Sequence, residues 1–490
     1  MEISGSPRES SVTPPQTIPA SLPAAIAQTT DPPLAPSAPT AWTPLARVSF
    51  RIAFVYFFFF LFCFDNGTLF GMIPRLGEWI DDGLTWPMNH LAVWVGQHVF
   101  HLTGIAARWH PTGSGDTTLN WILNGLFLLF AVTGGLLWSA VAARRGNRRA
   151  EYRTLHAWLR FLLRFTIAMF MFEYGLAKLF PLQMAPISIA ILNEPVGHVS
   201  PMTFLWSLIA LNPAYESILG LAEVVGGVLL LFRRTALLGA LFSSFVLANV
   251  VLDNFFFDVP VKLFATALLL ASLFLVLPDL SALFRFFWLR QPAVPNGVWA
   301  PPTSRRAFRI TIRTFEIIFL VFFLALAPFG MFMGWKQRRN EAHISSPLLG
   351  AWHLDPAHPA SGPFITPEGL PATDLYLDTV VRAFTRSSDG TLWRTYPRID
   401  AGAHTIAVFI PASSNEVTYS WQMPDPDHII LTSLPPEAPK PGPKAKLQPG
   451  AKPDRPFTPA ILTFTRTPTP PQYPLLDRGF HFINQWGLER

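Results

Sequence analysis

The sequence predicts a mainly α-helical transmembrane bundle of about seven spans, followed by a small all-β domain that forms a barrel or a sandwich. Half of the 490 residues are hydrophobic and 14% are charged, whereas average soluble domains are roughly a quarter charged. The apolar residues gather in runs such as FVYFFFFLFCF at 54–64. Beyond residue 335 these runs give way to short, partly alternating segments rich in β-branched and aromatic residues. A purely soluble globular protein is therefore excluded.

The first 45 residues differ from both of these parts. They hold ten prolines among Ala, Ser and Thr, and Arg8 is the one positive charge before Arg47. Such a segment cannot bury enough apolar surface to offset its ordering entropy, so we expect 1–45 to be disordered. It also lacks the basic start and the continuous apolar core of a signal peptide.

Seven stretches are long enough to cross the membrane, since about 20 apolar residues in a helix span the ~30 Å hydrocarbon layer. Helices are expected because an open strand edge in lipid would leave backbone groups unpaired. The segment 200–214, ahead of the fourth stretch, is interfacial, re-entrant or a further span. The predicted spans are 47–66, 118–142, 158–180, 214–232, 235–254, 260–280 and 311–334.

Basic residues set the predicted orientation. The loops at 143–157, 233–234 and 281–310 are rich in arginine, whereas the alternate loops hold only Arg75 and Arg108. The positive-inside rule places the arginine-rich loops in the cytoplasm. We therefore expect a bacterial inner-membrane protein with a cytoplasmic N-terminus and a periplasmic or extracellular C-terminal domain. Three basic residues after the last span oppose this assignment: Lys336, Arg338 and Arg339. The arginines of the earlier loops outnumber them.

The expected domains follow from these features. Two transmembrane helices with an outer loop occupy 46–157, a four-helix core 158–285, a cytoplasmic linker with the last helix 286–334, and an outer β-rich domain 335–490. Much of the net charge of +6 lies beside apolar segments, where it orients the chain. The expected partner is thus the lipid bilayer, and no nucleic acid. The single cysteine, Cys63, excludes an internal disulfide and a CxxC redox pair.

Polar residues inside or beside the spans are the main candidates for a functional site, because a charge at mid-bilayer costs about 2.5–3.5 kcal/mol. The predicted topology places them all in the outer half of the four-helix core. We expect Lys178 to pair with Glu223, and Lys262 with Asp253 or Asp258. The group forms a pocket for a quinone headgroup, a proton relay or a small substrate, or else a set of ion pairs that holds the helices together. Its members are Glu173, Lys178, Glu216, Glu223, Asn249, Asp253, Asp258 and Lys262.

Three segments of this core carry a family resemblance. FEYGLAKLF at 172–180, LAEVVGG at 221–227 and DVPVKLF at 258–264 resemble the DoxX-like bacterial membrane proteins. The family's Gly-x-x-Lys segment matches Gly175 with Lys178, and its Glu-x-x-Gly-Gly segment matches Glu223 with Gly226 and Gly227. The resemblance covers roughly 155–285 and implies a four-helix unit, in a long form with a C-terminal extramembrane domain. Some family members are associated with thiosulfate:quinone oxidoreduction, which implies a quinone and a redox partner subunit.

The first outer loop holds a histidine cluster and a glycine-rich turn. His90, Trp94, His98 and His101 fall near one face of an expected short amphipathic helix. His98 and His101 are spaced to hold a metal or a haem iron, but the residues also suit an interfacial helix, which we prefer. The turn at 110–118 offers Gly113 and Gly115 to an anion, and we expect Asp116 to cap the second span. No metal site is predicted.

The β domain is predicted to be a meander of short strands. Gly350-Ala351-Trp352 is similar to the Gly-x-Trp opening of lipocalin-like barrels, in which the tryptophan plugs one end; a bound lipophile is the alternative. We expect 435–456 to be an exposed loop and the tail with Asp477, Arg478, His481, Asn484 and Trp486 to dock on the barrel or the membrane. The predicted strands are 350–355, 374–384, 391–396, 404–410, 416–423, 428–434 and 460–467.

Two functions follow. The chain is a redox-associated subunit that binds a quinone or small molecule in an outer-leaflet polar pocket, or a non-catalytic envelope protein whose helices anchor a periplasmic ligand-binding or sensing domain. With one cysteine, electrons in the first case come from a bound cofactor or another subunit. Whether the chain is an enzyme stays open, since no Ser-His-Asp, GxSxG or Rossmann signature is present.

Overall fold

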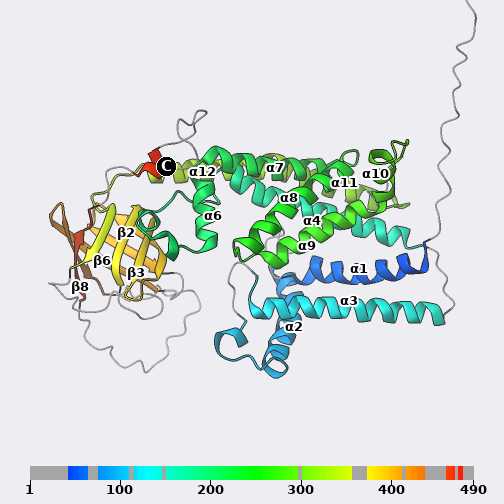
Figure 1. Cartoon of the computed structure of the whole chain (residues 1–490), viewed down its shortest axis with the longest axis horizontal. Helices are drawn as coiled ribbons and strands as arrows, with labels where there is room; N and C mark the ends of the chain where they lie inside the picture. Colours follow the sequence, from blue (N-terminus) through cyan, green and yellow to red (C-terminus); the bar gives the residue numbers. More distant parts are fainter. Residues whose placement is uncertain are drawn as a thin grey trace, which may run out of the picture.

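The computed structural model describes residues 42–64, 75–109, 115–145, 151–295, 301–355, 372–410, 415–435, 459–468 and 473–477. Within these residues, seven helices are long and apolar enough to cross a membrane, and eight strands form a closed barrel (Figure 1). The predicted fold class is confirmed: a membrane helical bundle carries a C-terminal β-barrel domain. Of the segment 1–45 that was predicted to be disordered, residues 1–41 lie outside the described residues.

Each predicted span coincides with a long apolar helix. Two of the seven are interrupted by a short segment of another helix type and then continue. The spans are α1 (Pro44–Cys63), α3 (Thr118–Arg144), α4 (Arg153–Leu179), α7 (Pro213–Leu231), α8 (Ala236–Phe256), α9 (Lys262–Val276) with η4 (Leu277–Asp279) and α10 (Leu280–Phe287), and α11 (Arg306–Val321) with η5 (Phe322–Leu326) and α12 (Ala327–Ala342).

The remaining described helices are not among the seven that are long and apolar enough to cross a membrane. The helix α6 (Pro201–Ala210) has ten residues, about half of what a span needs. In Figure 1 it lies across the direction of the spans, near the barrel, so the segment 200–214 is not a further span. The other helices outside the seven are α2 (Leu76–His98), which has 23 residues, and four shorter ones: η2 (Gly104–Ala107), α5 (Ile189–Leu192), η3 (Val196–His198) and α13 (Pro474–Asp477).

Successive spans run in opposite directions, and this sorts the loops between the two ends of the bundle. Figure 1 shows the connections after α3, α7 and α10 at the right-hand end, with the barrel at the left-hand end. These three connections carry the arginines Arg144, Arg145, Arg233, Arg234 and Arg290. The bundle therefore separates a basic end from a barrel end.

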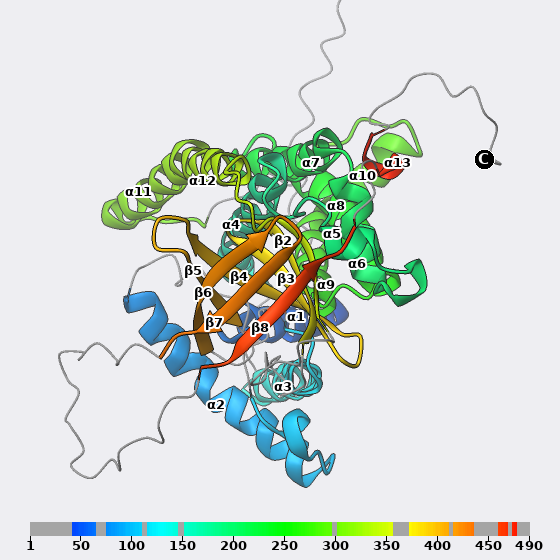
Figure 2. The same ribbon diagram turned by 90° about the vertical axis from the view of Figure 1, so that its left-hand side faces the viewer.

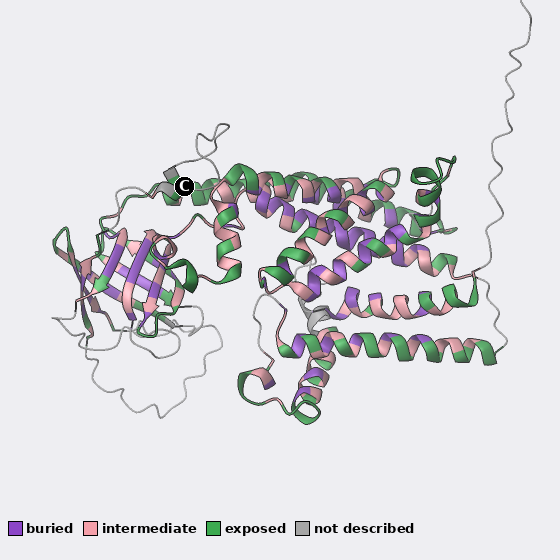
Figure 3. Cartoon of the chain, viewed as in Figure 1, coloured by how far each residue is buried: buried purple, intermediate pink, exposed green. Residues whose placement is uncertain are grey.

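The helix α4 lies at the centre of the bundle. Most of its residues are buried, whereas α3 and the long last helix are mostly exposed (Figure 3), as expected where lipid covers the outer helices. Rings on α4 pack against rings on α11: Phe165 meets Phe319 edge to face, with centroids 4.9 Å apart, and Phe161 meets Phe315 at a tilt, with centroids 6.0 Å apart. An aromatic column thus joins the last span to the core.

The closest helix contact joins α4 to α7 through two glycines. A Cβ atom added at Gly220 would lie 2.3 Å from the Leu179 backbone nitrogen and 2.5 Å from the Gly175 carbonyl oxygen. A Cβ atom at Gly175 would lie 2.9 Å from the Val224 backbone nitrogen. Small residues permit such backbone approach in membranes, where packing rather than the hydrophobic effect joins helices.

The barrel closes because its first and last strands pair. All neighbours are antiparallel, and β1 pairs with β8 through Trp352 and Arg466 among others (Figure 2). Apolar side chains fill the interior, among them Trp352, Leu375 and Phe464, all fully buried. The strands are β1 (Gly350–Leu354), β2 (Ala372–Thr379), β3 (Arg382–Ser387), β4 (Leu392–Asp400), β5 (Thr405–Ile410), β6 (Asn415–Asp425), β7 (His428–Ser433) and β8 (Ile461–Arg466).

Two sequence predictions about this domain need correction. The segment 374–384, predicted as one strand, contains the turn between β2 and β3, where Thr379 lies opposite Arg382. The turn residues Val380 and Val381 are β-branched and read as strand, which hid the hairpin. The helix α12 continues to Ala342, so the expected boundary at 335 lies within a helix and the barrel begins at Gly350. Two predicted segments lie outside the described residues: the loop predicted at 435–456, except for its first residue, and the tail from Arg478 onward.

Gly220→Ala is expected to destabilise the bundle, because the new methyl group would meet the backbone of α4 rather than a movable side chain. Overpacking of this kind costs about 1–3 kcal/mol. The thermal unfolding midpoint of the detergent-purified protein measures the effect. Gly125→Ala is the matched control, since its Cβ would have no neighbour within 4 Å, and its midpoint should not fall. Equal midpoints for the two variants would contradict the close contact.

Candidate functional site

A buried ion pair joins α4 and α7 in the barrel half of the bundle. The Lys178 Nζ atom donates to both carboxylate oxygens of Glu223, at 2.8 and 2.9 Å. Lys178 is 9% exposed and Glu223 is 5% exposed. The Tyr174 ring lies one turn before the lysine, with its centroid 5.9 Å from Nζ. This is the pairing that the sequence predicted, and the contact confirms it.

The local sequence explains why the two charges meet. Lys178 lies in the last turn of α4, and Glu223 lies on α7 close to Gly220. A Cβ atom at Gly175 would lie 2.9 Å from the Glu223 Cβ atom, so the glycine leaves room for the glutamate beside the α4 backbone. The Gly-x-x-Lys and Glu-x-x-Gly-Gly segments therefore supply both the charges and the space between them.

Two further acids of the predicted group lie within electrostatic reach of Lys178. Glu216, which is 1% exposed, accepts a hydrogen bond from the Met184 backbone nitrogen at 3.0 Å and interacts with Lys178. Asp253 on α8 is exposed and also interacts with Lys178. Lys178 therefore contacts one carboxylate directly and interacts electrostatically with two more.

The rest of the predicted group does not join this centre. Lys262 pairs with Asp258 at 2.8 Å, one turn away on its own segment, and Asp258 is mostly exposed. This confirms one of the two expected partners. Asn249 is exposed and donates to the Phe245 carbonyl oxygen of its own helix. Glu173 is exposed on α4. The eight residues therefore share one end of the bundle but not one pocket.

The expected role of Asp116 was wrong. Thr117, rather than Asp116, caps α3, in a capping box with Asn120. The Asp116 carboxylate instead accepts hydrogen bonds from the backbone nitrogens of Lys262, at 2.6 Å, and Leu263, at 3.0 Å. Lys262 lies 146 residues further along the chain. It caps the start of α9, since an acid there satisfies free N–H groups and favours the helix dipole. Gly113 lies outside the described residues.

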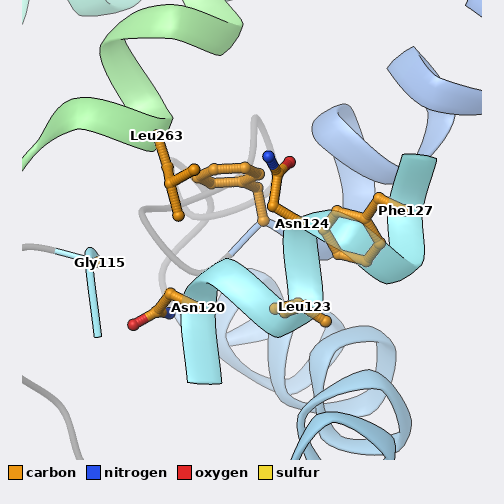
Figure 4. A pocket seen from close by; sticks show the side chains of 7 residues that line it. Gly115, Asn120, Leu123, Asn124, Phe127 and Leu263 are labelled. Carbon is orange, nitrogen blue, oxygen red and sulfur yellow. The ribbon is translucent and has the colours of Figure 1, made fainter. Parts of the chain in front are cut away.

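A small pocket lies beside this cap, between the ends of α1, α3 and α9 (Figure 4). Its walls are mostly apolar and include two amide side chains. The buried Asn124 Oδ1 atom has no hydrogen-bond partner among the described residues, so the pocket offers an acceptor to a small donor. The lining residues are Phe64, Gly115, Asn120, Leu123, Asn124, Phe127 and Leu263.

The histidines of the first outer loop are occupied by their own helix. The His98 ring stacks on Trp94, with its Nδ1 atom 2.9 Å from the Trp94 carbonyl oxygen, and His90 contacts Trp86 in the same way. His101 was expected on this helix, but α2 ends at His98, and His101 lies beyond it with a left-handed φ of 53° that an α-helix does not allow. Among the described residues, no three His, Cys, Asp or Glu side chains are grouped to hold a metal ion.

Sequence reasoning missed the buried charges at the basic end. Arg160 and Asp279 are both fully buried and lie 3.3 Å apart. Arg164, 1% exposed, lies 3.5 Å from Glu316, which also pairs with Arg233 at 3.0 Å. Arg233 was assigned to a loop when the chain was oriented, and Arg160 and Arg164, which lie inside the predicted span 158–180, were not considered. Glu316, a lone acid within an apolar span, was the signal that could have found them.

Sequence reasoning also missed the junction between barrel and bundle. The Asp378 carboxylate on β2 accepts hydrogen bonds from Ser188 Oγ at 3.0 Å and from the Ile189 backbone nitrogen at 2.9 Å. Arg382 pairs with Asp378 at 3.0 Å and donates to the Pro186 carbonyl oxygen at 2.8 Å. Burial raises the pKa of the Asp378 carboxyl, and the nearby Arg382 opposes that shift.

A second contact strengthens this junction. Arg386 on β3 donates to Glu194 at 2.6 Å, and Arg338 of α12 donates to the Leu182 carbonyl oxygen at 2.7 Å. The segment 180–200 between α4 and α6 is therefore held by both the barrel and the last span. These contacts fix the barrel to one end of the bundle.

Inside the barrel, Trp352 behaves as a core residue. It is fully buried, donates from Nε1 to the Leu348 carbonyl oxygen at 2.8 Å, and is covered by the Arg466 guanidinium at 4.1 Å from the ring centroid. Three other interior side chains carry buried polar atoms without a hydrogen-bond partner among the described residues: Thr385 Oγ1, Thr395 Oγ1 and Trp421 Nε1.

These features define the class: an integral membrane protein whose helical bundle carries a docked β-barrel domain. Among curated proteins, the chain is similar to the uncharacterized protein YwoB of Bacillus subtilis (strain 168), with 33% identity over 132 residues, which are 27% of this chain and 81% of that protein. The chain belongs to the family of YwoB. No family model and no solved structure matches it.

Lys178→Met and Glu223→Met are each expected to destabilise the protein by about 3–5 kcal/mol, because each leaves one buried charge unpaired. The double variant should be more stable than either single one, since it buries no charge. Thermal unfolding in detergent measures all three. Lys262→Met is the control. This variant should lose less than about 1 kcal/mol of stability, because the partner of Lys262, Asp258, is exposed. Additive losses in the double variant would contradict a coupled pair.

Asp378→Ala is expected to loosen the barrel junction, because it leaves the Ser188 hydroxyl and the Ile189 N–H without their acceptor. Hydrogen exchange of the 188–194 backbone should become faster, while exchange within β5 to β7 should not change. Glu416→Ala is the control, since Glu416 pairs with Arg398 on the barrel surface away from the junction. Unchanged protection of 188–194 would show that this contact does not hold the barrel.

Proposed function

We propose that this chain is an inner-membrane envelope protein whose helices anchor and orient the barrel as a ligand-binding or sensing domain on the outer face. The observation that carries this proposal is that the barrel and the arginine-rich connections lie at opposite ends of the bundle (Figure 1). By the positive-inside rule the basic end faces the cytoplasm. The barrel then faces the periplasm or the exterior, and the N-terminus faces the cytoplasm.

The junction supports an oriented domain rather than a tethered one. Asp378, Arg382 and Arg386 attach the barrel to the segment 180–200, and Arg338 attaches the last span to the same segment. A flexible linker would need none of these contacts.

The barrel interior supports ligand binding. The buried polar atoms of Thr385, Thr395 and Trp421 have no hydrogen-bond partner among the described residues, and a buried polar group without a partner costs about 1–3 kcal/mol. A ligand or water molecule that bonds to these atoms would recover that free energy. The expected class of ligand is small, with both a donor and an acceptor.

Site-directed labelling tests the orientation. In a Cys63→Ser background, Ala401→Cys on the barrel should react with an impermeant maleimide in intact spheroplasts. Arg234→Cys in the turn after α7 should react only after the membrane is opened, because the proposal places it in the cytoplasm. The reverse pattern would place the barrel in the cytoplasm and end the proposal.

A second candidate function rests on the charges around Lys178. We propose that the core is DoxX-like, as the two motif segments suggest, and that this outer-leaflet centre binds a quinone or similar small molecule in a redox-associated complex. Lys178 lies beside the Glu223 carboxylate and interacts with Glu216 and Asp253. Acids within a membrane serve as proton relays, and reduction of a quinone to a quinol consumes two protons. The electrons would come from a partner subunit or a bound cofactor.

Glu223→Gln tests this second function. If the centre serves a quinone, membranes containing the variant should lose quinone reduction by the electron-donating partner, because Gln cannot pass on the protons that reduction of a quinone to a quinol consumes. Asp258→Asn is the control, since Asp258 is exposed and outside the centre, and its activity should equal that of the unchanged protein. A chain with no such activity, whose barrel nevertheless captures a ligand, supports the anchoring function alone.

A further inference from the structure

A second group of charges lies at the basic end, where three helices meet. Arg233, just after α7, donates from Nη2 to both carboxylate oxygens of Glu316 on α11, at 3.0 and 3.1 Å. Arg164 on α4 donates from its own Nη2 to Glu316 at 3.5 Å. Two guanidinium groups therefore share one carboxylate.

Arg164 is poorly satisfied by this arrangement. It is 1% exposed, and its guanidinium carbon lies 4.6 Å from the ring centroid of Phe165 and 5.8 Å from that of Phe161. Its Nε and Nη1 atoms are buried without a hydrogen-bond partner among the described residues. A buried cation costs several kcal/mol unless a well-placed anion compensates it.

The neighbouring charges do not supply that compensation. Arg160, one turn before Arg164, has a carboxylate of its own in Asp279, at 3.3 Å. The group of Arg164, Arg233 and Glu316 thus keeps one positive charge more than it has negative ones. The shared carboxylate is closer to Arg233 than to Arg164, which leaves the more deeply buried arginine with the weaker contact.

Arg233 is the part of this group that a ligand can reach. Its side chain is 50% exposed, and it follows directly on the end of a span, at the depth of the lipid headgroups. Basic sites between helices at this depth bind anionic lipid head groups. The planar fork of arginine matches the oxygens of a phosphate.

We propose that Arg233 binds the phosphate of an anionic phospholipid, in the leaflet at the basic end, and that Glu316 then turns fully to Arg164. The lipid supplies the anion that the group lacks, and the released carboxylate compensates the buried arginine. The last span is thereby held to the core by a lipid-dependent contact. This inference is independent of the function of the barrel.

Native mass spectrometry of the full chain in mild detergent tests the proposal, with phosphatidylglycerol as the added lipid. Arg233→Ala should lower lipid retention about fivefold, which corresponds to about 1 kcal/mol for one lost hydrogen-bonding partner of the phosphate. Arg285→Ala is the control with the same change of charge at the same end; Arg285 is exposed on α10, and retention should not change. An equal loss in both variants would indicate unspecific charge attraction and overturn the site.

Glu316→Gln separates the proposal from a purely structural role. It removes the carboxylate that competes for Arg233, so retention should rise about fivefold. Because this variant leaves Arg164 buried without an anion, the double variant Arg164→Met with Glu316→Gln repeats the test with a neutral core. Retention that is unchanged or lower in the folded double variant would overturn the proposal.

Two further arms identify the source of the phosphate. Phosphatidylcholine, whose headgroup has no net charge, should be retained less than phosphatidylglycerol. Millimolar inorganic phosphate should not displace the bound phosphatidylglycerol, because the site lies at the headgroup depth of the leaflet. Displacement by inorganic phosphate would show that the site takes free phosphate and overturn the assignment to a lipid.

Discussion

The close contact between α4 and α7 is the constraint on which the membrane part depends. Two glycines bring the helix backbones together, and this contact encloses Lys178 and Glu223 where neither could be hydrated. In lipid there is little hydrophobic drive between helices, so shape and polar pairing decide which surfaces meet. The ion pair selects α7 as the partner of α4, and the glycines make the fit possible. The remaining spans then pack around α4, the most buried of the seven.

The polar residues at the barrel end divide their roles according to depth. Lys178 and Glu223 are enclosed, Glu216 ties down the chain after α4 through Met184, and the Lys262–Asp258 pair lies near the surface. Asp116 uses its charge to start a helix far away in the sequence. Apart from the Lys178 centre, these are structural tasks, which is why the anchoring function ranks ahead of the redox one.

The parts of this structure that sequence could predict are those that depend on local patterns. Apolar runs located all seven spans, and alternation located the barrel strands except at Val380 and Val381, where strand-like residues form a turn. The Lys178–Glu223 pair was predictable because topology brings late and early residues of adjacent antiparallel spans to one depth. Two other contacts could not be predicted: the cap of α9 by Asp116 and the junction at Asp378. Each joins segments that lie more than a hundred residues apart in the sequence. No local pattern records such contacts.

The length of the last span, from Arg306 to Ala342, has a mechanical consequence. Its 37 residues make it about 55 Å long at 1.5 Å per residue, well beyond the ~30 Å of the hydrocarbon layer. The surplus turns project as a stiff stalk toward the barrel, which begins eight positions after the helix ends, at Gly350. Because Arg338 ties this helix to the segment 180–200, on which the barrel docks, a tilt of the helix would be passed to the barrel through that segment. Since helix tilt follows bilayer thickness, the position of the barrel would depend on the thickness of the surrounding membrane.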